Sequence, residues 1–379
     1  MKNTILLVRN VRAKDFGGAE TYQLQLAKIL KKEKLRPVII TSSRGLRSTA
    51  KQQKLKVTRG LHFPLQNWSS WRNLLLPLYF LWQITLCIWY LTLVVRFRPQ
   101  VLHLQSRDDY IAGTIIGKIT HTSVIWTDHA DFCAFIWQNL NVKYKNPIGK
   151  CIYRLSHIPY KITTISKYEY TKIKQLIHPR KLPNLIVFSN GVIDSYEKYQ
   201  RITPEPQSFC YIGRIVKEKG ITELIEAFNR LMPHYPHAKL HLYGDGADLL
   251  QYQKNKNSQV IFHGHTNKPL DALADCEIFI LPSYKEGLSL ALLDAAMMER
   301  SIIATNVGGT NEVVIDHQTG LLVDAKSSDE LYRAMCELLD NPKLRKYLAT
   351  NARERYLKHF DFSTLVSQQL FLIYYNQDE

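Results

Sequence analysis

Residues 282–294, PSYKEGLSLALLD, hold the change of pattern that decides the fold of the surrounding chain. Residues 277–281 before them form a short apolar run that Pro282 ends, which predicts a buried strand. Residues 288–298 contain no Gly or Pro and are rich in Leu and Ala, which predicts a helix. The stretch therefore predicts a strand, a loop and a helix, in that order.

Two acidic residues occupy this stretch, Glu286 in the glycine-containing loop and Asp294 inside the helix. Carboxylates accept hydrogen bonds from sugar hydroxyls, and the amino end of a helix favours phosphate. Together they favour a nucleotide-sugar as the ligand.

The same alternation of strand and helix runs along the whole chain. It predicts an α/β fold with parallel sheets that helices cover on both faces. The strands expected in the first half are residues 4–8, 38–41, about 55–58, 101–104, 124–126, 162–165 and 186–188. Those expected in the second half are residues 209–212, 239–243, 260–262, 278–281, 302–305 and 321–323. The helices expected between them include residues 19–32, 112–119, 167–177, 222–232, 268–274, 290–298 and 329–339.

A length of 379 residues allows two domains, each with its own core. Residues 195–207 are polar and include two prolines, which predicts a boundary there. We therefore expect a first domain of residues 1–195 and a second domain of residues 196–359. The apolar, aromatic tail, residues 360–379, is expected to pack back on the first domain.

The net charge of +17 is distributed unevenly. Residues 1–200 hold 31 Lys and Arg against 10 Asp and Glu, and residues 201–379 hold 19 against 23. This asymmetry indicates that the first half faces a polyanion, such as nucleic acid, anionic lipid headgroups or a phosphorylated acceptor. The alternative is a basic surface that serves only solubility.

The cysteines and the amino terminus bear on the compartment. Six scattered cysteines form no Cys-x-x-Cys pair, which is typical of reduced thiols in the cytosol. Residues 4–8 are too short for a secretory signal and fit a first strand. We expect a cytoplasmic protein.

Residues 74–95 carry no charge and are flanked by Arg72, Arg96 and Arg98, and four of the six tryptophans lie at positions 68, 71, 82 and 89. The segment is long enough to span a bilayer. A single crossing would separate strands that belong to one sheet, so two alternatives stand. One is a core helix that is apolar on all sides, and the other is an interfacial helix docked on a membrane.

Gly213-Arg214 follows one predicted strand, and Lys219 lies where the next helix begins. Arg offers a planar fork of donors and Lys a mobile charge, and both are expected at the carboxyl edge of a parallel sheet, where such sheets bind ligands. The pair is predicted to contact a diphosphate; the alternative is an exposed basic loop.

Gly17-Gly18 connects the first strand to the first helix and would let the backbone approach a phosphate or an acceptor. His129 lies just after a strand, where it could contact a sugar hydroxyl or accept a proton; a histidine bonded locally is the alternative. His103 alternates with apolar residues and is predicted to be structural. Gly191 is predicted to supply a positive φ in a turn.

No metal site is predicted, because there is no Asp-x-Asp run and the pair His263 and His265 is attributed to chance. No cofactor is predicted either. The Gly-Gly turn does not match the Gly-x-Gly-x-x-Gly pattern of nicotinamide binding.

Taken together, these motifs resemble those of glycosyltransferase family 4, the retaining transferases of GT-B fold. The resemblance covers nearly the whole chain. Its most specific part is a pair of carboxylates with seven residues between them, here Glu286 and Asp294, where the family usually has Glu at the second position. The motifs in order are Gly17-Gly18, His129, Gly213-Arg214 with Lys219-Gly220, Gly244-Asp245-Gly246, Glu286-Gly287-Leu288-Ser289 through Asp294, and Gly308-Gly309 with Glu312.

The resemblance implies two Rossmann-like domains that face a central cleft. It implies that Arg214 and Lys219 neutralise the diphosphate leaving group without a metal and that Glu286 orients the sugar. It further implies that Asp294 holds the ribose and that His129 approaches the sugar. The loop residues Gly17, Gly18, Gly213, Gly287, Leu288 and Ser289 complete the expected donor site. Glu312 is expected to pair with Arg214 or Lys219, or to cap its helix.

The expected activity is transfer of a sugar, with retention of its anomeric configuration, from a UDP- or GDP-sugar to a hydroxyl of a glycan or polyprenyl-linked saccharide. Such chemistry belongs to the assembly of cell-surface polysaccharide or glycolipid. The basic first half and residues 74–95 are expected to contact an anionic membrane, and no nucleic acid is expected. The alternatives are a GT-B sugar-nucleotide epimerase and an inactive α/β protein that binds a membrane or nucleic acid.

Overall fold

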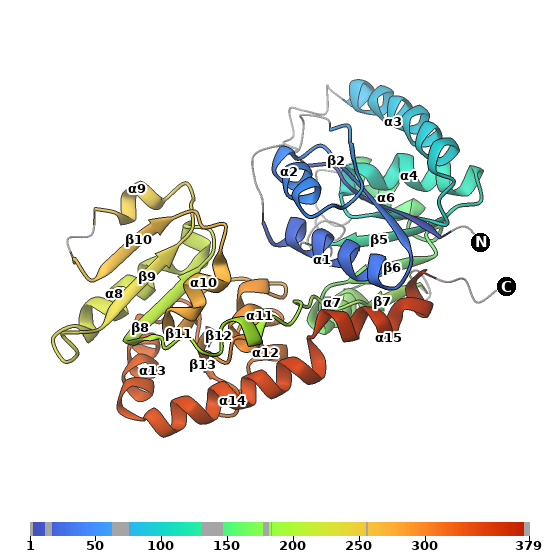
Figure 1. Ribbon diagram of the computed structural model, residues 1–379. Helices are drawn as coiled ribbons and strands as arrows, with labels where there is room; N and C mark the ends of the chain where they lie inside the picture. Colours follow the sequence, from blue (N-terminus) through green and yellow to red (C-terminus); the bar gives the residue numbers. More distant parts are fainter. Residues whose placement is uncertain are drawn as a thin grey trace. The chain divides into compact units, whose positions relative to one another are not determined.

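The computed structural model describes residues 3–11, 17–62, 76–129, 147–176, 182, 184–254 and 257–374 (Figure 1). The chain forms two compact units. The first unit is discontinuous and consists of the chain up to Ser189 and the chain from Val366 onward. The second unit is Asn190–Leu365.

The described part of the first unit is built on a parallel sheet of seven strands in the order β3-β2-β1-β4-β5-β6-β7. The strands are β1 (Thr4–Arg9), β2 (Arg36–Thr41), β3 (Val57–Arg59), β4 (Val101–Leu104), β5 (Ser123–Asp128), β6 (Lys161–Thr164) and β7 (Leu185–Val187). The helices are α1 (Gly18–Lys32), α2 (Arg44–Gln52), α3 (Leu76–Phe97), α4 (Arg107–Ile119), α6 (Pro147–Leu155), α7 (Lys167–Leu176) and, from Val366 onward, α15 (Phe362–Tyr374).

The second unit has a parallel sheet whose six described strands follow the order β10-β9-β8-β11-β12-β13. The strands are β8 (Glu205–Ile212), β9 (Lys239–Tyr243), β10 (Val260–Gly264), β11 (Cys276–Leu281), β12 (Ser301–Thr305) and β13 (Leu321–Val323). The helices are α8 (Ile221–Leu231), α9 (Leu249–Tyr252), α10 (Pro269–Ala274), α11 (Leu290–Met297), α12 (Thr310–Val313), α13 (Ser328–Asp340) and α14 (Pro342–His359), with short 3-10 turns η3 (Tyr196–Lys198) and η4 (Lys217–Lys219).

The central strand β11 shows why this sheet is buried on both faces. Ile278 and Ile280 belong to the core shared with α8 and α13, whereas Phe279 and Leu281 belong to the core shared with α11 and α14. Successive side chains of a strand point to opposite faces, so a continuous apolar run is what a sheet covered on both sides requires. The predicted α/β class with two parallel, Rossmann-like sheets is confirmed.

By its internal contacts the chain divides after Ser189, six residues before the expected boundary at residue 195. The cause is a set of contacts that tie residues 190–194 to the second unit. Val192 exchanges backbone hydrogen bonds with Phe360 (3.3 Å) and Phe362 (3.0 Å), and the Asn190 side chain donates to the Leu288 carbonyl (2.9 Å). The proline-rich stretch that suggested a linker instead leads into β8.

Gly191 does not have the predicted positive φ. A side chain there would meet the Phe360 carbonyl and the Phe362 backbone, so the glycine is required for close packing instead.

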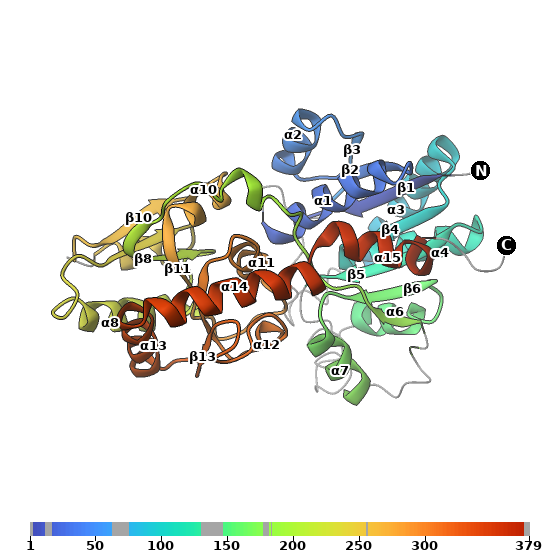
Figure 2. The same cartoon turned by 60° about the horizontal axis from the view of Figure 1, so that its bottom comes forward.

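Helix α15 packs on the first unit, next to α1 and β4 (Figure 2). The Tyr374 hydroxyl lies 2.8 Å from Nδ1 of His103, whose Nε2 lies 2.6 Å from the Thr127 hydroxyl. Burial lowers the pKa of His103 to about 3, so the ring stays neutral and both nitrogens are hydrogen-bonded. His103 is structural, as predicted.

Helix α3 contains most of the uncharged segment, whose first two residues, together with the tryptophans at 68 and 71, lie outside the described residues. By length and composition it could cross a membrane. It nevertheless lies between β3 and β4, two strands of one sheet that a single membrane crossing would place on opposite sides of the bilayer.

One face of α3 packs on α4, where Tyr90 donates to Asp109 (2.9 Å) and Gln83 to the Asp108 carbonyl (3.2 Å). The opposite face is exposed and apolar. A core helix buried on all sides is therefore ruled out.

Tyr374→Phe tests the docking of α15. The change removes the partner of a buried histidine nitrogen, so we expect the free energy of unfolding to fall by about 1–3 kcal/mol. Urea unfolding measures it. Leu372→Ser, at an exposed position of the same helix, is the control; an equal loss in both variants would contradict the assignment.

Candidate functional site

The loops that follow β8 and β9 lie against each other at the carboxyl edge of the second sheet. The Gly213 amide donates to the Tyr243 carbonyl (3.0 Å), and a side chain on Gly244 would overlap the Gly213 carbonyl. The Tyr211 hydroxyl donates to the Arg214 carbonyl (2.8 Å) and fixes the turn. The Arg214 side chain is left exposed at this edge, and no described residue bonds to its guanidinium.

Lys219 and Glu286 form an ion pair with 2.5 Å between Nζ and Oε1. Their side chains are 19% and 10% exposed, so the pair is largely shielded from water. The Ser283 hydroxyl donates to the same oxygen (2.6 Å), while Oε2 makes no hydrogen bond to a described residue. The pair leaves donors on the ammonium and an acceptor on the carboxylate for a ligand that carries both phosphate and hydroxyl groups.

Two glycines bring the loop after β12 against the Glu286 loop. Gly308 has φ +58°, and a side chain there would overlap the Glu286 carbonyl. The Gly309 amide donates to the Gly287 carbonyl (2.8 Å). Gly220 has φ +69° and lies equally close to the Pro282 carbonyl, which brings Lys219 to the same loop. Only glycine allows backbones to approach this closely.

Ser289 caps the amino end of α11, where its hydroxyl accepts from the Leu292 amide (3.4 Å), and Leu288 is buried beneath the loop. Asp294 lies on the next turn and is half-buried. Burial raises the pKa of its carboxyl to about 7, and no described residue donates a hydrogen bond to it. A carboxyl held in this way is suited to accept hydrogen bonds from a ligand.

A second group of predicted residues lies at the carboxyl edge of the first sheet. The Gly17 amide donates to Glu20 (3.0 Å), and Glu20 pairs with Arg9 (2.7 Å). Arg9 also donates to the Gln105 carbonyl (2.9 Å), and the Gln105 side chain lies 3.4 Å from Nε2 of His129.

His129 packs edge-on against Tyr22, with ring centroids 4.8 Å apart. Burial, together with the nearby Arg9, holds the pKa of His129 well below its usual range. The ring is therefore neutral at neutral pH and can exchange a hydrogen bond with a hydroxyl.

The structure thus unites Lys219 with Glu286, and it links Gly17 to His129 through a chain of contacts. Glu312 lies in α12, where its carbonyl accepts two hydrogen bonds from Arg355 (2.9 and 2.7 Å). The sequence did not point to Ser283, which lies two residues after β11, within residues 282–294. The Arg9–Glu20 pair was missed as well; its signal was an acidic residue one turn after the Gly-Gly turn.

His263 lies 3.0 Å from His241. Within the described part of the chain, no group of three or more His, Cys, Asp or Glu side chains is arranged to hold a metal ion.

Two family models match the chain in succession. "Glycosyltransferase Family 4" matches residues 16–195, and "Glycosyl transferases group 1" matches residues 193–355.

Among curated proteins, the chain is 28% identical over 186 residues to the capsular polysaccharide biosynthesis glycosyltransferase CapM of Staphylococcus aureus, covering 47% of this chain and 48% of CapM. It is 27% identical over 292 residues to an uncharacterized glycosyltransferase of Methanocaldococcus jannaschii, covering 70% and 73%. The chain spans about half the length of the first of these relatives.

Among solved structures, Anabaena HepE in complex with UDP and glucose superposes with a TM-score of 0.74 at 16% identity, covering 98% of this chain and 99% of HepE. At this identity the likeness establishes the fold alone.

Asp294→Asn measures the cost of burying this carboxyl. Its folded pKa of about 7 lies above the ordinary value of 3.8, so the folded protein retains a proton that the unfolded chain has released. Wild-type stability therefore falls as pH rises from about 4 to about 7. We expect the variant to exceed the wild type by about 1–3 kcal/mol at about pH 8 and by clearly less at about pH 5.

Urea unfolding at both pH values makes the comparison. Asp324→Asn, at an exposed position, is the control and should change stability by less than about 0.5 kcal/mol at either pH. A gain for Asp294→Asn that is the same at both pH values would contradict the raised pKa.

Proposed function

We propose that this chain, which belongs to glycosyltransferase family 4 and is a glycosyltransferase of GT-B fold, transfers a sugar from a nucleotide-diphosphate sugar to a hydroxyl of a glycan or lipid-linked saccharide. The observation that carries the proposal is the shielded Lys219–Glu286 pair, which places a phosphate-binding cation and a hydroxyl-binding carboxylate side by side at the carboxyl edge of the second sheet.

In this proposal Lys219 and Arg214 bind the diphosphate of the donor. The leaving group gains negative charge as the glycosidic bond breaks, and fixed cations lower that barrier without a metal ion. Arg214 supports this role because its exposed guanidinium has no partner among the described residues. Glu286 is held by Lys219 and Ser283 on one oxygen and offers the other to the transferred sugar.

Asp294 is proposed to bind the ribose of the donor. Its carboxyl lies on the helix that follows the Glu286 loop and has no described hydrogen-bond donor. Its side chain is one methylene shorter than the glutamate usual at this position, which favours a ribose held closer to α11.

We further propose that transfer retains the anomeric configuration, with the leaving phosphate taking the proton of the acceptor hydroxyl. Contact between His129 and the sugar stays a prediction. The neutral ring of His129 fits hydrogen bonding to a hydroxyl better than pairing with a phosphate.

We propose a lipid-linked acceptor and a cytoplasmic enzyme that binds peripherally to an anionic membrane. The exposed apolar face of α3 and the basic charge of the first 200 residues support this contact. The five cysteines described by the structure are free thiols, in keeping with a reducing compartment.

Lys219→Ala and Glu286→Ala test the donor site. Each removes half of the ion pair, and we expect kcat/KM for transfer to fall by about 100- to 1000-fold while the thermal unfolding curve keeps its cooperativity. A radiolabelled-donor assay measures the loss.

Lys217→Ala is the matched control, because it removes an exposed lysine from the same short turn. It should keep most of the activity. Wild-type rates in both Lys219→Ala and Glu286→Ala would overturn the site assignment.

Product analysis tests the reaction itself. With a UDP- or GDP-sugar and a polyprenyl-linked saccharide, we expect a new glycosidic bond whose configuration, read by NMR coupling constants, matches that of the donor. Transfer should persist in EDTA. Isomerised donor formed without acceptor would instead identify an epimerase, and no conversion of any nucleotide-sugar would leave a binding protein.

A further inference from the structure

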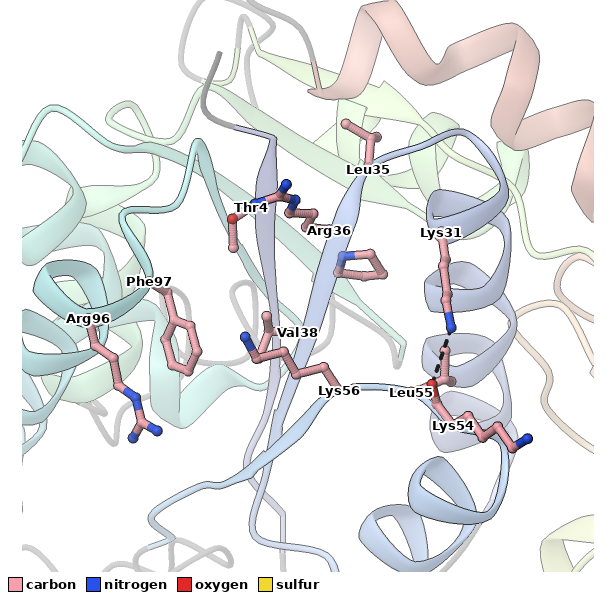
Figure 3. A pocket seen from close by; sticks show the side chains of 11 residues that line it. Thr4, Lys31, Leu35, Arg36, Val38, Lys54, Leu55, Lys56, Arg96 and Phe97 are labelled. Carbon is pink, nitrogen blue, oxygen red and sulfur yellow. Dashed lines mark hydrogen bonds between the residues drawn. The ribbon is translucent and has the colours of Figure 1, made fainter.

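A basic pocket of about 410 Å³ opens at the amino edge of the first sheet (Figure 3). It lies at the start of β1 and β2, whereas Gly17 and His129 follow the carboxyl ends of β1 and β5. Parallel strands begin at the same edge, so this pocket is separate from the candidate site. Its lining residues are Thr4, Lys31, Leu35, Arg36, Pro37, Val38, Lys54, Leu55, Lys56, Arg96 and Phe97.

Five of these residues are cations and none is acidic. Figure 3 shows the Phe97 ring between Lys56 and Arg96, each 5.2 Å from the ring centroid, and the Lys31 ammonium donating to the Lys54 carbonyl (3.3 Å). No ion pair to a described carboxylate neutralises the five. Positive charges gathered in a concave site raise the local concentration of anions.

The surrounding sequence also lacks acidic residues. Between Glu33 and Asp108 the chain has no Asp or Glu, yet it has twelve Lys and Arg. This acid-free segment contains β2, α2, β3 and α3 and supplies four of the five pocket cations. They are therefore not placed to pair with acidic neighbours in their own part of the chain.

The pocket adjoins the exposed face of α3. Leu81, Ile84, Ile88, Leu91 and Val95 recur at helical spacing and are 42–68% exposed. Val95, the most exposed of them, immediately precedes Arg96 of the pocket. We call these five residues the apolar stripe. An apolar stripe beside basic residues is the pattern of a helix that lies in a membrane interface.

We propose that the basic pocket binds the phosphate of an anionic phospholipid headgroup while the apolar stripe lies among the acyl chains. This proposal rests on the membrane contact proposed above and specifies its chemistry. A phosphate accepts hydrogen bonds from several cations at once, and the pocket volume suits a small headgroup. The apolar stripe favours a lipid over nucleic acid, which offers no apolar phase.

Sedimentation of the full-length protein with lipid vesicles tests the proposal. The wild type should bind vesicles of phosphatidylcholine with phosphatidylglycerol and bind pure phosphatidylcholine far more weakly. Lys56→Gln with Arg96→Gln should lower the partition coefficient on anionic vesicles by about thirty-fold, because each cation near an anionic surface contributes about 1 kcal/mol. Ile84→Ser with Ile88→Ser should lower binding to both kinds of vesicle.

Lys343→Gln with Lys346→Gln removes the same charge from an exposed part of the second unit and should lower binding less than about three-fold. Equal losses in this control and in the pocket variant would overturn the proposal in favour of diffuse attraction. A pocket that is stabilised by inorganic phosphate in a thermal shift assay, without vesicle binding, would be a site for free phosphate. Tighter binding to an RNA oligonucleotide than to vesicles, lost in the pocket variant, would also overturn it.

The same preparations separate this proposal from the proposed function. Transfer to a water-soluble acceptor should proceed equally in the wild type and in Lys56→Gln with Arg96→Gln. Pocket-dependent vesicle binding by a protein without transfer would leave the pocket proposal standing and refute the enzymatic one. Sugar transfer by a protein whose vesicle binding does not depend on the pocket would refute the pocket proposal and leave the enzymatic one standing.

Discussion

Close backbone contacts in the second unit hold together the loops after β8, β11 and β12, and the proposed donor site depends on them. Gly220 approaches the Pro282 carbonyl and Gly308 the Glu286 carbonyl at distances that exclude any side chain. This constraint brings Lys219 within 2.5 Å of Glu286 in a largely shielded setting. Exclusion of water strengthens the electrostatic interactions of both side chains, and the ion pair holds them in place before a ligand binds. Electrostatic stabilisation of a leaving group requires such a preorganised site.

Charge is used differently at the two edges of the first sheet. At the carboxyl edge, Arg9 is neutralised by Glu20, and His129 is kept neutral by burial. At the amino edge, the basic pocket has no described acidic partner and adjoins the apolar stripe. This contrast supports the two proposals that the carboxyl edge offers hydrogen bonds to a ligand and that the amino edge docks on an anionic surface, so that each function has an edge of its own.

Much of the fold could be predicted, because strands buried on both faces are apolar runs; residues 101–104, 239–243 and 321–323 match β4, β9 and β13. Glu286 and Lys219 could be found because glycines and charges mark loops at strand ends. Contacts between distant segments could not be predicted from the sequence. Val192 forms backbone hydrogen bonds with Phe360 and Phe362, which place the residues from Asn190 onward in the second unit, and Gly191 packs closely there without the predicted positive φ. The burial of one face of α3 depends on a hydrogen bond between Tyr90 and Asp109, which are distant in sequence. The basic pocket is lined by several separate segments, and its one signal in the sequence is the absence of acidic residues between Glu33 and Asp108.

If Lys219 and Glu286 hold an activated sugar, calorimetric titration with UDP-, GDP- and ADP-sugars detects the binding itself. We expect at least one of these donors to bind the wild type, with an affinity that falls at least tenfold in Lys219→Ala but stays unchanged in Lys217→Ala. Binding of equal strength in all three proteins, or no binding of any nucleotide-sugar, would contradict this role of the pair.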